Sequence, residues 1–412
     1  MRRTHVLVGW LLILSTTAVS AHAGPLTFDQ ALARAADTAP SLKAAALRVE
    51  AARSTRRSAG TLPDPKLALG IENVPISGPL AGRFGADEMT MASVGVMQDM
   101  PSRPARRAET ERAQAEIGAA DAQADVEARA VRLATAQAWV DLHYAKARLA
   151  ALDDIEKALK PMLDTAPSAV ARGLRPAETI DPAEWLLGLA DRRSALVADI
   201  ARARAALVRW TGDPEADVVG MAPHWEVDPV LLRAGLDRHP TLLALDAGVR
   251  VADADVTGAK AAVSPDWSWE LAYQRRDPMF GDMVSARVTL SLPVRQGQRQ
   301  GPAIDARSAD ATRARTDREA ARRELIAALE ADLADHRMHH DLWTRARDTR
   351  FPLAQRRADL ETASYAAGTA GLPDVLAAFT ALADTRLDAL DKEAEVMRDA
   401  IRINLTYGTD AS

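Results

Sequence analysis

The sequence predicts a mainly α-helical protein with a smaller β part of the membrane type, and three observations lead to this fold class. Long stretches such as residues 303–351 contain neither proline nor glycine, and aromatic residues make up only 4% of a chain that is 48% hydrophobic. Four short segments alternate between apolar and polar residues, as strands with two different faces do. The same order of features occurs twice, which indicates duplicated long-helix hairpins and four strands per subunit.

The composition excludes several classes of protein. The 412 residues include no cysteine, which rules out disulfides, cysteine-ligated zinc, thiol catalysis and a lipid-bearing N-terminal cysteine. The formal net charge of −5 gives no reason to expect a nucleic-acid partner. At this length the chain can form one large domain or two to three ordinary ones.

The first segment has the pattern of an export signal. Arg2 and Arg3 precede an apolar stretch at 6–19, and Ala21-His22-Ala23 offers a cleavage site between small residues. We therefore expect residues 1–23 to be a signal peptide, with an uncleaved N-terminal anchor as the alternative. An exported chain without a spanning helix is either soluble outside the cytoplasm or inserted as a β-barrel.

An internal repeat divides the rest of the chain. Pro40, Val49 and Pro65 match Pro240, Val249 and Pro265 at one fixed offset, and strand-like alternation follows the last proline of each set. We place the first repeat at 24–212, an inter-repeat linker at 213–227, the second repeat at 228–408 and a C-terminal tail at 409–412. A period this long indicates a duplicated unit and excludes a solenoid.

Each repeat is expected to contain a helix, two strands and then long helices. The first helix should run from Thr27 to Thr61, because Thr27 and Gln30 form a capping-box pattern and prolines follow Thr61. In the first repeat, strands are expected near 66–76 and 88–98 and long helices over 102–212. In the second repeat, strands are expected near 266–276 and 283–292 and long helices over 294–407. Helices of this length cannot be buried in a compact domain, so they must project as hairpins or build a tube.

The strand segments have the alternation and length of membrane strands. Each has about 9–11 residues, the length of a tilted strand that crosses a bilayer. Glu72, Glu270 and Arg287 fall on the polar side, which favours a water-filled lumen. A soluble four-stranded sheet packed on helices is the alternative. Because the smallest bacterial barrels have about eight strands, four can close a barrel only by oligomerisation, and three copies would supply twelve.

With these features, the sequence resembles the TolC-like outer-membrane factors, the exit ducts of tripartite efflux pumps. The resemblance covers nearly all of the chain after the signal segment. The stretches that carry it are Thr27–Leu32 with Asp37–Pro40, Leu62–Leu67, Leu290–Val294, Tyr365–Gly368 and Asp374–Leu376. It implies a homotrimer, a 12-stranded outer-membrane β-barrel, and a trimeric α-barrel that forms a periplasmic tunnel. It further implies docking onto a periplasmic adaptor and an inner-membrane pump of the RND type.

Within that family, the sequence is most similar to the heavy-metal branch of CusC/CzcC-like channels. Asp64–Leu67 leading to Glu72–Pro75, and Asp87–Met91 leading to Gly95–Gln98, carry this closer resemblance. Many relatives have a lipidated N-terminal cysteine, which this chain lacks, so anchoring is expected from the barrel alone.

The resemblance also implies functional residues. Asp374 matches the family's gating aspartate, and three copies near the trimer axis would form an acidic ring, although an aspartate in a first turn also stabilises its own helix. Ala377, the next matching position, is not acidic, which puts a second ring in doubt. The hairpin tips at Arg172-Gly173-Leu174 and Gly368-Thr369 match the adaptor-docking turns, and helix-ending glycines are the alternative.

The remaining candidates do not amount to a catalytic or metal centre. His336 and His340 lie one helical turn apart, a spacing that can hold a transition-metal ion, but no third ligand is visible and packed or tunnel-facing histidines are favoured. No nucleophile–base pair is found, so we expect no enzyme activity, no cofactor and no resident metal. The predicted function is passive export, with heavy-metal cations as the favoured substrate. The alternatives are drug or solute efflux, type I secretion, or a soluble periplasmic coiled-coil scaffold.

Overall fold

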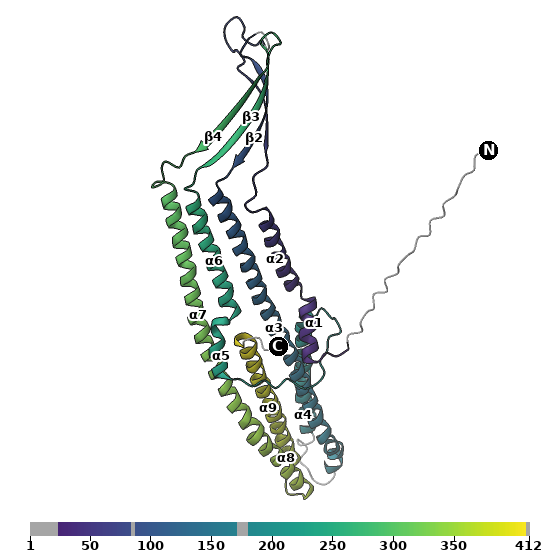
Figure 1. Cartoon of the computed structure of the whole chain (residues 1–412). Coiled ribbons are helices and arrows are strands. Elements are labelled where there is room, and N and C mark those ends of the chain that lie inside the picture. Colours follow the sequence, from purple (N-terminus) through teal and green to yellow (C-terminus); the bar gives the residue numbers. More distant parts are fainter. Residues whose placement is uncertain (1–23, 84–86, 171–179, 409–412) are drawn as a thin grey trace, which may run out of the picture.

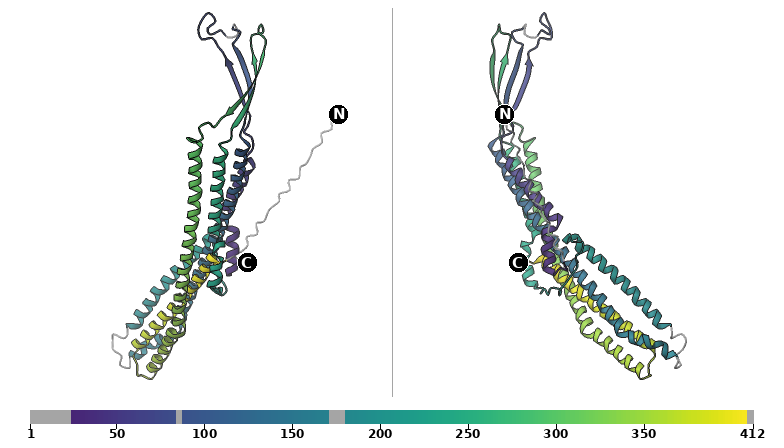
Figure 2. Two further views of the ribbon diagram at one scale, coloured as in Figure 1. Left: turned by 60° about the vertical axis from the view of Figure 1, so that its left-hand side comes forward. Right: turned by 90° about the vertical axis from the view of Figure 1, so that its right-hand side faces the viewer.

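The computed structural model describes residues 24–83, 87–170 and 180–408. It shows an elongated helical body that carries a thin four-stranded sheet at one end, while two helical hairpins end at the other (Figure 1). The body bends near its middle (Figure 2). In the described ranges, no helix combines the length and the apolarity that a membrane crossing requires.

The elements follow one another in the same order in the two halves of the chain. In the first half they are α1 (Phe28–Thr38), α2 (Pro40–Ser58), β1 (Lys66–Glu72), β2 (Met91–Met100), α3 (Arg103–Val170) and α4 (Asp181–Thr211). In the second half they are α5 (Pro229–Gly235), the short 3-10 helix η2 (Leu236–Arg238), α6 (Pro240–Ala261), β3 (Asp266–Arg275), β4 (Met283–Ser291), α7 (Gln300–Arg345), the π-helical turn η3 (Ala346–Arg350), α8 (Phe351–Ala366) and α9 (Leu372–Tyr407).

The first helix is broken where the sequence predicted one continuous helix from Thr27 to Thr61. The Thr27 cap is confirmed, since its hydroxyl accepts from the Gln30 N–H and the Gln30 side chain accepts from the Thr27 N–H. The prediction of a single helix is wrong because Ala39 is extended, with φ −60° and ψ 121°, and Pro40 opens a second helix. A proline ring disfavours helical backbone at the residue before it. His239 before Pro240 is extended in the same way.

The stretches with few prolines form the helices that span the body, and α3 continues past Pro161 and Pro167. α3 has 68 residues, which corresponds to about 100 Å at ~1.5 Å per residue. Helices α7 and α8 follow one another through η3, directly before Pro352 in the first turn of α8. Proline lacks the N–H that a regular turn needs, so the wider turn at η3 lies where the hydrogen-bond ladder is interrupted.

The buried core runs along the body as separate clusters that α9 connects. The central cluster contains Trp139, which is fully buried, with Phe28 and Ile401 packed nearby. The Trp139 indole N–H donates to the Leu26 carbonyl at 2.9 Å, and its ring meets Phe28 edge-on at 5.6 Å. A second cluster lies toward the hairpin end and a third beside α5, and α9 contributes residues to all three.

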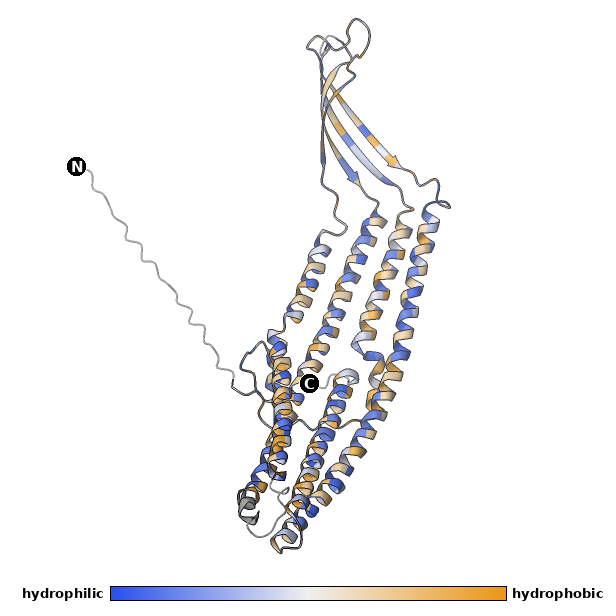
Figure 3. Cartoon of the chain, turned by 180° about the vertical axis from the view of Figure 1, so that it is seen from behind, coloured by the Kyte–Doolittle hydropathy of each residue, from blue (hydrophilic) through white to orange (hydrophobic). Residues whose placement is uncertain are grey.

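The sheet has the order β1-β2-β3-β4, and every neighbouring pair is antiparallel. Apolar and polar residues are interspersed along its strands (Figure 3). None of the described helices lies against either face in any view (Figures 1 and 2). Within the described ranges, β1 and β4 are edge strands with no partner on their outer side.

Candidate functional site

The strand register assigns the predicted lumen residues to one face of the sheet. Glu270 lies opposite Arg287 on β4 and opposite Met97 on β2, and Met97 lies opposite Lys66 on β1. Side chains on one strand share a face at every second residue, so Glu72 lies on the same side as Lys66. The Arg287 guanidinium and the Glu270 carboxylate form an ion pair at 3.4 Å. One face of the sheet is therefore polar and charged.

The opposite face of the sheet is apolar and uncovered. Its large apolar members are Leu67, Leu69, Ile71, Val94, Val96, Trp267, Trp269, Leu271, Tyr273, Val284, Val288 and Leu290, and its polar members Gln98 and Arg275 lie toward the strand ends. Leu69 and Val288 are 73% and 62% exposed in the single chain. An exposed apolar surface of this extent requires an apolar environment. The soluble alternative needs helices packed on this sheet, and the described helices supply none (Figure 1).

The hairpin tip between α8 and α9 is built by Gly368. Its φ of +75° lies in the left-handed region, which glycine reaches without strain. The Gly368 N–H donates to the Tyr365 carbonyl at 3.0 Å and the Thr369 N–H donates to the Ser364 carbonyl at 2.9 Å, which is the Schellman pattern of a helix end. The other predicted tip, Arg172, Gly173 and Leu174, lies outside the described residues.

Asp374 lies in the first turn of α9, close to this tip. Its carboxylate is exposed and accepts from the Gly371 N–H at 3.0 Å, so the side chain caps the helix that carries it. Higher on α9, Asp384 and Asp391 pair with Arg192 and Arg148 at 2.9 and 2.5 Å. In the part of the chain that the structure describes, Asp374 has no such basic partner. Among the described residues, its negative charge is therefore offset only by the N-terminus of its own helix.

The structure places the two predicted histidines in a cavity that the sequence did not reveal. His336 and His340 on α7 line a cavity of about 600 Å³ together with His143 on α3, His224 on the linker and Glu393 on α9. Burial lowers the pKa of His143 and of His336, while the Glu393 carboxylate opposes this effect at His143. These residues are up to 250 positions apart in sequence, so no local pattern could have brought them together.

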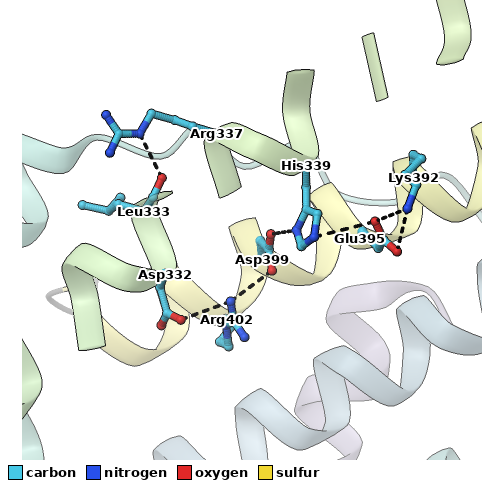
Figure 4. A network of polar contacts seen from close by, with 8 residues as sticks. All are labelled: Asp332, Leu333, Arg337, His339, Lys392, Glu395, Asp399 and Arg402. Atoms are coloured by element: carbon cyan, nitrogen blue, oxygen red, sulfur yellow. Dashed lines mark hydrogen bonds and ion pairs between the residues drawn. The ribbon is translucent and has the colours of Figure 1, made fainter. Parts of the chain in front are cut away.

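A polar network joins α7 to α9 (Figure 4). His339 Nδ1 lies 2.6 Å from a carboxylate oxygen of Asp399, a residue that is only 6% exposed. Arg402 contacts both Asp399 and Asp332, at 3.0 and 3.1 Å, and the Tyr407 hydroxyl donates to Asp332 at 2.9 Å. Burial and this hydrogen bond raise the pKa of Tyr407. The network fixes the position of the C-terminal helix against α7.

Comparisons with known proteins agree with this architecture. The family model described as outer membrane efflux protein matches residues 31–213 and 231–409, one segment in each half. No curated protein matches the sequence. Three similar solved structures are a membrane protein from Pseudomonas aeruginosa, the transmembrane channel CusC, and the open state of the Neisseria gonorrhoeae outer membrane channel MtrE.

The likeness to these structures extends over almost the whole chain at low sequence identity. The Pseudomonas protein is 17% identical with a TM-score of 0.79, and 92% of each chain is covered. CusC is 15% identical with a TM-score of 0.77, covering 95% of this chain and 96% of that one. MtrE is 15% identical with a TM-score of 0.74, and the match covers 92% of this chain and 88% of the MtrE chain. The structures show the fold, and with both halves matched by the family model, the chain belongs to the outer membrane efflux protein family.

Proposed function

We propose that three copies of this chain form a passive channel that leads from the periplasm through the outer membrane to the outside. One observation carries this proposal: the sheet has one apolar face and one charged face, and its two edges are unpaired among the residues that the structure describes. Four strands cannot close a cylinder, whereas three copies of the sheet, joined edge to edge between β4 and β1, supply twelve. Lipid then covers the Leu69 and Val288 face, and Glu72, Glu270 and Arg287 face water in the lumen.

The helical body continues the pore below the sheet. Helices α3, α7 and α9 are long, carry many charged residues and run along the body, as the walls of a tube require (Figure 3). In a trimer, three Asp374 carboxylates near the axis would form an acidic ring at the lower end, which attracts cations. The charge at this position lacks a basic partner among the described residues, in keeping with a gate and unlike the paired carboxylates higher on α9.

The partners of such a channel bind at its periplasmic end. We propose that the tip at Gly368 and Thr369, together with the tip at Arg172, Gly173 and Leu174, docks a periplasmic adaptor protein, which links the channel to an inner-membrane pump of the RND type. The Schellman turn at Gly368 gives this tip a fixed backbone shape. The backbone N–H and C=O groups of this tip therefore have the same positions in every copy of the chain, and a docking partner can recognise them.

Conductance measurements test the channel directly. Purified protein in planar bilayers is expected to conduct ions with a preference for cations. If the channel is closed on its own, the measurement is made with the adaptor protein bound. Asp374→Asn should shift the reversal potential in a salt gradient toward that of an unselective pore, because three negative charges are lost while asparagine can still accept from the Gly371 N–H. Asp374→Glu is the matched control and should retain the preference.

The outcomes separate the two parts of this proposal. A wild-type protein that never conducts, even with its adaptor, would contradict the channel. Unchanged cation preference in Asp374→Asn would remove only the gate. Release of the protein into the soluble periplasm on fractionation would favour the scaffold alternative.

We further propose that the cargo is a heavy-metal cation. Two observations support this substrate class: the acidic Asp374 position, and the resemblance of four short stretches to the heavy-metal branch, namely Asp64–Leu67, Glu72–Pro75, Asp87–Met91 and Gly95–Gln98. Loss of the gene should then sensitise cells to transition-metal salts and leave their sensitivity to lipophilic drugs unchanged. Growth curves with both classes of compound measure this, with complementation by the intact gene as the control. The opposite pattern would favour drug efflux.

A further inference from the structure

The cavity between α3, α7, α9 and the inter-repeat linker gathers most of the imidazole groups of the described chain. Six histidines lie in the described ranges, and four of them, His143, His224, His336 and His340, line this cavity. They come from three separate segments, one in each repeat and one in the inter-repeat linker, and none has a role in the channel proposed above. The full chain has eight histidines, so half of them line this one cavity.

The walls of the cavity hold polar atoms that lack a hydrogen-bond partner within the described part of the chain. His336 Nδ1 and Trp343 Nε1 are buried atoms without a hydrogen bond among the described residues. A buried donor or acceptor without a partner is unfavourable, so an occupant that supplies one is favoured. A metal ion can take the lone pair of a histidine nitrogen, and a water bound to it can accept from the Trp343 N–H. The ring centroids of His336 and His340 are 6.5 Å apart, with His340 exposed at the rim. The two imidazoles therefore lie next to each other on one face of α7, and a side-chain rotation must bring them closer before both can bind one ion.

We propose that this cavity binds one divalent transition-metal ion of the zinc, nickel or copper type, with His336 and His340 as its two protein anchors. Imidazole nitrogens are preferred ligands of these ions, and two histidines four residues apart on a helix can hold one ion together. His143, His224 and Glu393 stand around the same space and can add a ligand after side-chain rotation.

In this site two histidines would coordinate the ion, and the protein does not hold a complete set of ligands in place beforehand. Among the residues that the structure describes, no three histidine, aspartate or glutamate side chains are arranged to share an ion. Water completes the remaining positions, and the cavity of about 600 Å³ has room for it. A binding site of this kind is independent of the proposed conduction of ions. Asp374 lies in the first turn of α9, whereas Glu393 and Ala400, which line the cavity, lie much further along the same helix.

Titration of the purified, tag-free trimer with Zn²⁺ or Ni²⁺ in an isothermal calorimeter tests this site. We expect one ion per chain, with quenching of tryptophan fluorescence by Ni²⁺ because Trp225 and Trp343 line the cavity. His336→Ala/His340→Ala should weaken binding about tenfold or more. Mg²⁺, which prefers oxygen ligands, should not compete.

A matched control removes an imidazole elsewhere. His239→Asn eliminates a histidine outside the cavity, and asparagine retains the ability to cap α6 as His239 does. This variant should bind as the wild type does. The single substitution His340→Asn, at an exposed position, provides a variant whose folding is not in question, and it should also weaken binding.

Two results would overturn the proposal. Binding that is equal in the wild type, His340→Asn and the double variant would show that the ion sits elsewhere, and absence of one-equivalent binding in the wild type would show that the cavity takes no such ion. Conductance of the same preparations reports on the channel separately, so either result leaves the channel proposal standing.

Discussion

Val288→Arg is expected to block stable insertion of the sheet into a lipid bilayer. Val288 lies in the interior of β4 on the apolar face, opposite Trp269, and is 62% exposed in the single chain. Lipid would cover it in the proposed barrel, where an arginine near the bilayer midplane costs about 2–4 kcal/mol. Because each trimer contains three copies, the cost is incurred three times. Heat-resistant trimer on a gel, after reconstitution into vesicles, measures the effect.

The neighbouring residue supplies the control for this experiment. Thr289 follows Val288 directly and lies on the polar face, opposite Ser268. Thr289→Arg introduces the same side chain into the proposed lumen and should leave trimer formation close to that of the wild type. If both substitutions prevented trimer formation equally, the assignment of the two faces to lipid and water would be wrong.

Loss of the indole at position 139 is expected to destabilise the helical body strongly. Trp139 is fully buried, contacts Phe28 edge-on and stacks on His143 at 5.1 Å. Trp139→Ala leaves a large cavity in the central cluster. Such a substitution typically lowers the free energy of unfolding by about 3–5 kcal/mol. Thermal unfolding followed by circular dichroism should show a clearly lower midpoint.

Trp139→Phe separates packing from hydrogen bonding at this site. Phenylalanine keeps an aromatic ring but loses the N–H that donates to Leu26, and the Leu26 carbonyl still accepts from the Val219 N–H at 3.1 Å. The phenylalanine variant should therefore unfold between the wild type and Trp139→Ala. Equal midpoints for the two variants would mean that the hydrogen bond, and not the ring volume, stabilises the cluster.

Local rules were sufficient for much of the fold. The two-residue period of a strand assigns Glu270 and Arg287 to one face as soon as the strands are located, and the register agrees with that assignment. The Thr27 capping box and the positive φ at Gly368 likewise depend on residues close together in the chain. The break at Ala39 is harder to predict, because a proline such as Pro40 can lie within a bent helix or at the first position of a new one.

Contacts between distant segments were beyond the reach of the sequence. The ion pair between Arg402 and Asp332 and the contact between His339 and Asp399 depend on how α7 lies against α9, which periodicity does not determine. The four histidines of the cavity meet only after both repeats have folded around the linker. Only His336 and His340 can be paired from the sequence, since they are neighbours on a single helix.

The position of α9 has a consequence for biosynthesis. This helix supplies the last residues to three hydrophobic clusters, with Ile401, Leu382 and Tyr407 in one cluster each. Ribosomes make it after all the other described helices, so a nascent or prematurely terminated polypeptide would expose unfinished apolar surfaces on both repeats. Proteases that survey exported proteins could then distinguish truncated products from intact ones before any of them reached a partner subunit.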